Sequence, residues 1–264
     1  MDLDELVKVR ALFDSEMREG VQPDSAEARV ERVGAVVRHT VPGLGWNGVV
    51  WSDLDEGTAD AEIAAQVAFF SGREDPEFEW KLYDYDRPAD LGDRLRAAGF
   101  VAEPAETVLV ARTSDLAALP VEPPEGITLR VVEDEAGVDL MMEAHHRAFG
   151  TERPRIREHV LSLLRNEPES VEAVLAMAGD TPVCGARMEM RPGCSFAGLW
   201  GGGTDPQWRG RGIYRLLVAH RARVAAERGI PYLQVDASDD SRPILERLGF
   251  ASLGVTVPYV WPTA

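Results

Sequence analysis

Seven consecutive residues, Gln207-Trp208-Arg209-Gly210-Arg211-Gly212-Ile213, combine two glycines with two arginines. They follow the turn signal Asp205-Pro206 and open a segment in which apolar residues recur at helical spacing. Glycine lets a backbone approach an anion closely, and the first N–H groups of a helix have no acceptor within the helix. The stretch therefore predicts a phosphate-binding turn at the start of a helix, to which Arg209 and Arg211 add positive charge.

Other phosphate-binding motifs fit this turn less well. A P-loop requires Gly-Lys-Ser/Thr, which is not present here. A dinucleotide fingerprint requires a third glycine at position 215, where the chain has Arg215. A simple strand-to-helix turn with solvated arginines remains the structural alternative.

The surroundings of the turn carry a family resemblance. The Gln-x-x-Gly-x-Gly pattern is followed by Val235-Asp236-Ala237-Ser238 and by a short helical segment that ends in Gly249-Phe250. In order and spacing, residues 125–262 resemble the Gcn5-related N-acetyltransferase (GNAT) superfamily. The resemblance implies an α/β (α+β) fold, with a mixed twisted sheet flanked by helices, and bound acetyl-CoA as cosubstrate.

The resemblance also implies which residues would contact acetyl-CoA. A strand edge at Gly202, Gly203 and Thr204 would pair with the pantetheine arm, and Ser238 would touch that arm. The pyrophosphate would lie on the turn and first helical residues, which are Gln207, Arg209, Gly210, Arg211, Gly212, Ile213 and Tyr214.

Acyl transfer to an amine needs a proton acceptor, a donor to the thioester oxygen and a proton for the leaving thiolate. Three glycines after Trp200 predict a bulge or a close ligand approach, where backbone N–H groups can serve the oxygen. Candidates for proton transfer are Asp236 and Tyr259, which we take as the candidate catalytic residues. Asp239 and Glu189 are weaker candidates, because Asp239 is placed to cap a helix and Glu189 is expected to face solvent.

One position departs from the resemblance. Many family members have a tyrosine four residues before the Gly-Phe pair, where it protonates the thiolate, and this chain has Leu245 there. Leucine cannot donate a proton. Two alternatives to an enzyme therefore stay open: a CoA-binding regulatory module without turnover, and a non-enzymatic interaction protein.

The chain repeats its pattern at an offset of 150 residues without a gap, which indicates a partial tandem duplication. Asp55 aligns with Asp205, and Gly99-Phe100 aligns with Gly249-Phe250. Asp60 and Glu62 align with the two turn glycines. Their carboxylates would occupy the site that a pyrophosphate needs and would repel its negative charge. The first copy is therefore expected to bind no cofactor.

The proline-rich stretch 119–126 marks a domain boundary. We expect a degenerate GNAT-like domain at 1–120, a linker at 121–126 and a GNAT acetyltransferase domain at 127–264. Strands are expected at 46–54, 78–85 and 127–132, with a hairpin formed by 171–178 and 183–190. Helices are expected at 59–70, 89–98, 140–149 and 156–164.

Charge and composition limit the classes of partner and the compartment that we expect for the protein. The net charge of −17 argues against nucleic acid and anionic membranes, and no apolar run is long enough to span a bilayer. Two cysteines and no signal pattern favour the reducing cytoplasm. His145 and His146 are adjacent on a helix and point apart, so no metal is expected.

The sequence thus predicts an acetyl-CoA-dependent N-acetyltransferase that acts on a primary amine of a small molecule or peptide. A homodimer is compatible with it. Trp51 and Trp200 lie on strands near the expected cleft, where an aromatic face would suit a cationic amine.

Overall fold

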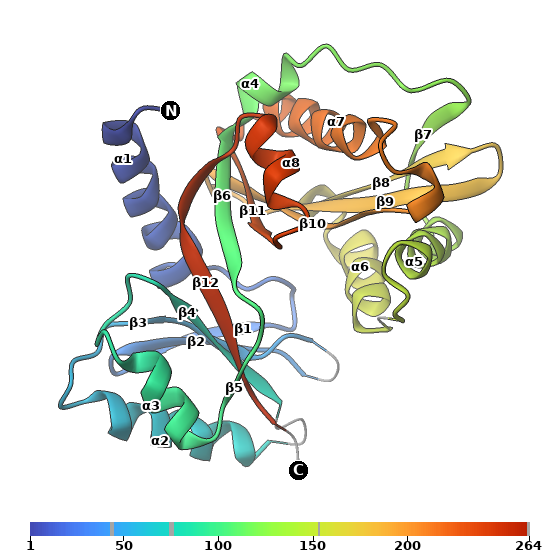
Figure 1. Cartoon of the computed structure of the whole chain (residues 1–264). Coiled ribbons are helices and arrows are strands. Elements are labelled where there is room, and N and C mark those ends of the chain that lie inside the picture. Colours follow the sequence, from blue (N-terminus) through green and yellow to red (C-terminus); the bar gives the residue numbers. More distant parts are fainter. Residues whose placement is uncertain (43–44, 74–76, 153, 263–264) are drawn as a thin grey trace. The chain divides into compact units, whose positions relative to one another are not determined.

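The computed structural model describes residues 1–42, 45–73, 77–152 and 154–262 and divides into two compact units (Figure 1). The first unit contains residues 1–109, residues 236–243 and the residues from Ala251 on. The second contains residues 110–235 and 244–250. The chain first passes from one unit to the other within β6 (Glu106–Arg112).

The first unit is built on a mixed sheet with the strand order β1-β2-β3-β4-β12. Strands β3 and β4 are parallel, and their other neighbours are antiparallel. The strands are β1 (Arg29–Val33), β2 (Val36–Thr40), β3 (Gly48–Ser52), β4 (Phe78–Tyr83) and β12 (Ala251–Trp261), with the short β5 (Val101–Ala102) beside β12. The helices are α1 (Leu3–Phe13), which continues into a π-helical turn at Asp14–Glu19, α2 (Ala59–Ser71) and α3 (Leu91–Ala98).

One apolar core joins these elements in the first unit. Helix α2 contributes Ile63 and Phe70, and α3 contributes Leu95. Phe70 stacks on Phe78 of β4 with ring centroids 4.1 Å apart. Because α2 and α3 bury apolar residues at helical spacing, burial of this face rather than helix propensity fixes their position.

The second unit has the strand order β11-β10-β9-β8-β7, in which only β10 and β11 are parallel. The strands are β7 (Ile127–Val131), β8 (Val171–Ala178), β9 (Thr181–Met190), β10 (Phe196–Thr204) and β11 (Tyr232–Ala237). The helices are α4 (Thr113–Ala117), α5 (Glu135–Phe149), α6 (Pro154–Asn166), α7 (Ile213–Glu227) and α8 (Arg242–Arg247). Helix α7 covers one face of β8–β10, and α5 and α6 cover the other (Figure 1).

Each predicted strand and helix is present with ends shifted by at most two residues, except that α5 begins at Glu135, five residues before its predicted start at 140. The duplication is present as well. In both copies the helix before the Gly-Phe pair ends on a left-handed glycine, with φ of +107° at Gly99 and +103° at Gly249. In both copies the phenylalanine N–H then donates to the carbonyl of a leucine, Leu95 or Leu245.

The ungapped offset of 150 is wrong within one segment of the repeat. Gly48 pairs with Glu79, which is 31 residues downstream, whereas Gly198 pairs with Gln234, which is 36 residues downstream. The second copy therefore has five more residues between these strands, partly because α7 has 15 residues and α2 has 13. By strand register, Lys81 is the counterpart of Asp236.

The compact units divide the chain at other places than the proline-rich stretch. Val121 packs on the core of the second unit, and Arg223 of α7 donates to the carbonyl oxygens of Leu119 and Val121 at 3.3 and 3.5 Å. The stretch is therefore held to α7. Strand β12 lies in the first unit, because its residues Thr256–Trp261 pair with β4.

Candidate functional site

A glycine turn and a bulged strand lie next to each other in the second unit. Strand β10 ends at Thr204, and Asp205 turns the chain. Its N–H donates to the carbonyl of Val183 at 2.9 Å, and its carboxylate accepts the N–H of Gln207 at 2.9 Å. A short 3₁₀ turn, Pro206–Trp208, then leads to α7. The buried Asp205 thus fixes where the turn begins.

The two glycines of the turn have the backbone that a phosphate cradle requires. Gly210 and Gly212 have φ of +76° and +81°, which favours glycine, and a Cβ at either position would meet nothing within 4 Å. Gly212 is the N-cap of α7, and its carbonyl accepts the N–H of Leu216 at 3.0 Å. The N–H groups of the first helical residues precede this ladder and are available to an anion.

Both arginines of the turn contact protein groups in or near the turn. Arg209 donates from Nε to the carbonyl of Thr204 and from Nη2 to the carbonyl of Ala148, both at 3.1 Å. Arg211 lies over the ring of Trp208, 4.5 Å from its centroid. Both leave positive charge beside the open glycines.

Strand β10 carries the predicted bulge. Trp200 is opposite Arg187 of β9, but Gly203 is opposite Gly185, so β10 has an extra residue between them. Gly201 has φ of +65°. A Cβ at Gly202 would lie 2.7 Å from the ring of Tyr214, so this glycine permits strand β10 to approach α7 closely.

The described pairing of β10 with β11 ends before the bulge. Their described register covers Phe196, Ala197 and Gly198, while β10 continues to Thr204. Past this register, the strand edge offers backbone groups to an extended ligand. The predicted site residues from Gly202 to Tyr214 are therefore brought together in one unit.

Three other predicted residues lie in the first unit. Ser238 is exposed, and its carbonyl accepts the N–H groups of Ser241 and Arg242 at the start of α8. Tyr259 is buried in the apolar core, with its hydroxyl against Gly92 of α3. Asp236 forms an ion pair with Lys81, and its side chain is 5% exposed.

Asp236 belongs to a group of ionisable side chains that the sequence did not reveal. Burial alone would lower the pKa of Lys81, but Asp236, Tyr83 and Glu79 raise it above its usual value. Glu79 accepts a hydrogen bond from the Trp46 indole at 2.9 Å. Burial, reinforced by the Asp236 charge, raises the pKa of Glu106 to about 7. Glu79, Lys81 and Tyr83 alternate along β4, but Asp236 and Glu106 come from β11 and β6, and no sequence pattern links those two residues to β4.

The expectation that Glu189 faces solvent is wrong. Its side chain is 11% exposed and accepts hydrogen bonds from Arg187 Nε at 2.6 Å and His159 Nε2 at 3.1 Å. Burial by itself would raise the pKa of this carboxyl, but the charges of Arg187 and His159 outweigh it and hold the pKa well below its usual range. Helix α6 covers this strand face, so Glu189 acts as a counter-ion.

Leu245 is fully buried, and its carbonyl accepts the Phe250 N–H at 3.1 Å. This hydrogen bond closes the C-terminal turn of α8. The position at which many family members have a proton donor is thus part of the apolar interior here.

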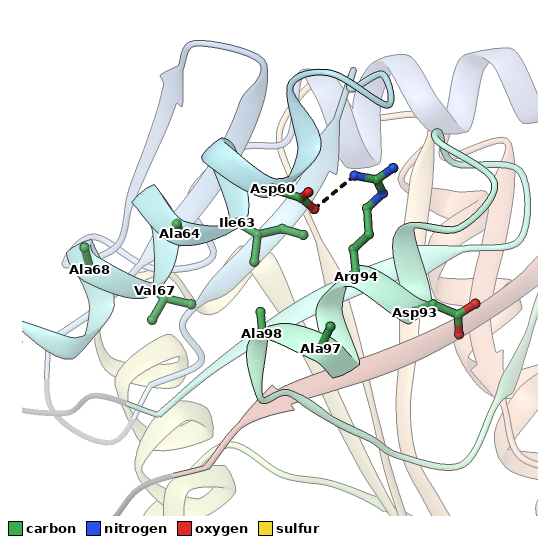
Figure 2. Close-up of a pocket in the computed structure, with 9 residues that line it drawn as sticks. All are labelled: Asp60, Ile63, Ala64, Val67, Ala68, Asp93, Arg94, Ala97 and Ala98. Carbon is green, nitrogen blue, oxygen red and sulfur yellow. Dashed lines mark ion pairs between the residues drawn. The ribbon is translucent and has the colours of Figure 1, made fainter.

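The first copy has its own groove between α2 and α3, lined mainly by small apolar side chains (Figure 2). Asp60 reaches across it to Arg94 at 3.0 Å. The carboxylate that accepts N–H groups of the helix-entry turn is Asp55, which binds the N–H groups of Gly57 and Thr58 at 2.9 Å each. Asp55 therefore fixes the start of this turn as its counterpart Asp205 does in the second copy, where Asp205 accepts the N–H of Gln207.

Within the described ranges, no cluster of His, Cys, Asp or Glu is arranged to hold a metal ion. Among the same residues, no helix has both the length and the apolar character needed to span a bilayer.

Comparisons with known proteins agree with this architecture. Residues 122–239 match the family described as "Acetyltransferase (GNAT) domain". No curated protein matches the sequence. Among solved structures, a GCN5-related N-acetyltransferase from Kribbella flavida is 19% identical with a TM-score of 0.70, over 90% of this chain and 91% of its own. A tandem GNAT protein from the clavulanic acid biosynthesis pathway is 12% identical with a TM-score of 0.62, over 100% of this chain and 97% of its own.

The glycine turn, the bulged strand and the mixed sheet define a GNAT-type acetyltransferase fold, duplicated in tandem. The family match over residues 122–239 shows that the second half of the chain carries a GNAT acetyltransferase domain, as the resemblance in its sequence implied.

Proposed function

We propose that the protein is an acetyl-CoA-dependent N-acetyltransferase that acetylates a primary amine of a small molecule or peptide. The observation that carries this proposal is the open glycine turn at the start of α7, beside the bulge of β10. Gly210, Gly212 and the first N–H groups of α7 would hold the pyrophosphate, and the edge of β10 would pair with the pantetheine arm. Acetyl-CoA supplies the activated acyl group.

In the proposed reaction, the amine nitrogen loses a proton and forms a bond to the thioester carbon, and the carbon–sulfur bond breaks. Backbone N–H groups of the bulge would stabilise the negative charge on the carbonyl oxygen. Asp236 and Tyr259 stay predictions for the proton transfers. The ion pair of Asp236 with Lys81 and the burial of Tyr259 give each residue a structural role as well.

We further propose that the first copy binds no cofactor and that the protein acts in the cytoplasm. Asp60 and Glu62 in place of the two turn glycines, and the Asp60–Arg94 pair across the groove, support the former. The small number of cysteines, two in the chain, supports the latter. A second candidate function, CoA binding without turnover, is favoured by the buried Leu245.

Acetyl-CoA binding can be tested with a variant that combines Gly210→Asp with Gly212→Glu. We expect affinity to fall about 100-fold or more, because two carboxylates would repel the pyrophosphate and strain the turn. The measurement is titration calorimetry with acetyl-CoA. The matched control combines Gly193→Glu with Gly229→Asp, two glycines with φ of +74° and +72° and open surroundings.

Unchanged affinity in the turn variant would show that the pyrophosphate assignment is wrong, and equal loss in the control would point to misfolding. An assay of thiol release with a panel of primary amines separates the enzyme from a binding module. Acetyl-CoA binding without thiol release for any amine would favour the second candidate.

A further inference from the structure

A small hollow in the second unit lies beside the β10 bulge, on the sheet face that α5 and α6 cover. Its walls include Met141 and Met142 of α5 and Ile156 of α6, and Arg187, Trp200 and Gly201 line it from the strands. Its free volume of about 10 Å³ admits one small group rather than a whole ligand. A ligand can therefore place only one of its ends in the hollow.

Arg187 is the charged group of this hollow. Its side chain is 12% exposed, and its guanidinium lies 5.6 Å from the centroid of the Trp200 ring. Its Nη1 is 3.5 Å from where a Cβ of Gly201 would stand, so the cation is next to the bulge. The aromatic face that could have received a cationic amine therefore already has a cation from the protein.

Positive charge exceeds negative charge around Arg187. Glu189 is shared by Arg187 and by Arg191, whose Nη2 is 3.5 Å from Glu189 Oε2, and also by His159. Among the described residues, Arg191 Nη1 is buried without a hydrogen-bond partner. One carboxylate thus faces two guanidinium groups.

The acidic residues of α5 do not correct this imbalance. Glu135 and Asp139 are exposed and pair with Arg157 at 2.8 Å each, and Glu143 pairs with Arg147 at 2.7 Å. An ammonium group alone would therefore be repelled at the hollow, whereas a carboxylate would be attracted. A guanidinium whose Nε is taken by Glu189 still has Nη donors for a second carboxylate.

We propose that this hollow recognises a carboxylate of the acceptor, so that the substrate is a small amino-acid-like amine, and that Arg187 is the residue that binds its carboxylate. This inference rests on the proposed acetyltransferase function and specifies its substrate class. Trp200 holds the guanidinium on one side, and Glu189 fixes its Nε edge. The methionines and Ile156 limit the hollow to a small group.

The first test compares acids with their amides. N-acetyl amino acids with side chains from glycine to methionine, and the corresponding N-acetyl amino acid amides, are titrated into the CoA-loaded protein by calorimetry. We expect the acids to bind about 10- to 100-fold more tightly, because the carboxylate makes a charge-assisted hydrogen bond that the amide lacks. Equal affinities, or no binding of any acid, would overturn the proposal.

The second test changes the arginine. Arg187→Gln should remove the preference for acids, and Arg187→Lys, which keeps the charge but loses the planar fork, should reduce it. Arg157→Gln, on a partly exposed arginine of α6 outside the hollow, should leave it unchanged. Acetyl-CoA affinity equal to wild type verifies that each variant is folded.

Preserved discrimination in Arg187→Gln would show that another group binds the carboxylate. The tests separate this proposal from the proposed function. If the wild-type protein does not bind acetyl-CoA, or does not release CoA thiol with any amine, the proposed acetyltransferase function is wrong. Acetylation of neutral amines as efficiently as of amino acids counts against the carboxylate site alone.

Discussion

Glu106 is a residue of the first unit whose pKa is raised to near neutral pH. Its neighbours include Asp236, Glu79 and Glu103, with Lys81 as the cation beside them. Burial and these carboxylates raise its pKa from the usual 4.5 to about 7. The folded chain therefore holds this proton more tightly than the unfolded chain, and the protonated form favours folding.

The stability contributed by this proton is fully present below about pH 4.5 and is lost as pH rises through about 7. Glu106→Gln mimics the protonated form, so we expect it to raise the free energy of unfolding by about 1 kcal/mol at pH 8, allowing for partial exposure of the group. At pH 5 the change should be small. Chemical unfolding curves between pH 5 and 8 measure it. Glu103→Gln, on an exposed neighbour, is the control, and an unchanged pH profile in Glu106→Gln would contradict the prediction.

Individual residues of the candidate site could be predicted from the sequence to different degrees. Glycines 210 and 212 stand out because few other residues adopt their backbone, and they lie close together in sequence. Glu189 was misjudged because helices cover both faces of its sheet, so alternation along β9 does not reveal an exposed side. The Glu106 group could not be predicted, because its members meet only through the fold.

Among the elements, the two Gly-Phe turns are the best-matched parts of the duplication. Both helices end with the same hydrogen bonds and the same left-handed glycine. Gly99→Ala and Gly249→Ala should each lower the free energy of unfolding by about 1 kcal/mol or more, because alanine is strained there. The loss should be larger at Gly99, where the new Cβ would lie 3.3 Å from the Trp261 ring.

Gly72 provides the control for this comparison, because it ends α2 with φ of −85°. Gly72→Ala should change stability by less than about 0.5 kcal/mol. Denaturant unfolding measures all three variants. A cost at Gly72 equal to the cost at Gly99 would show that backbone handedness is not the cause.

Helices and strands of the repeat were predictable because their apolar spacing is regular and their turns contain glycine or proline. The register between copies was not, since five residues inserted between paired strands leave the flanking motifs at the same offset. As a result, Lys81 and not Asp86 is the structural counterpart of Asp236.

The two compact units do not follow one another along the chain, because the first unit contains residues from both the start and the end of the sequence. β12 lies in the first unit, where it pairs with β4 and adds Tyr259 and Trp261 to the core. The proline-rich stretch suggested a simple division, because prolines are common in linkers. Strand pairing between distant segments, which composition does not reveal, decided otherwise.

Removing β12 tests this arrangement. A chain that ends after Phe250 should lose protection of backbone amides in β3 and β4, because their sheet and core lack a strand. Amides in β8 and β9, which pair with each other, should keep most of their protection. Hydrogen exchange followed by mass spectrometry distinguishes the two sets. Full protection of β4 in the shortened chain would show that β12 contributes little to the first unit.

The place of β12 also affects how the protein is made. A ribosome synthesises residues 110–250, which include the whole second unit and all five strands of its sheet, before it reaches β12 at Ala251. The second unit is therefore synthesised in full before the first, which must wait for the final segment. During that interval the edge of β4 that β12 will cover lacks its partner, so the start of this chain is the part most in need of a chaperone.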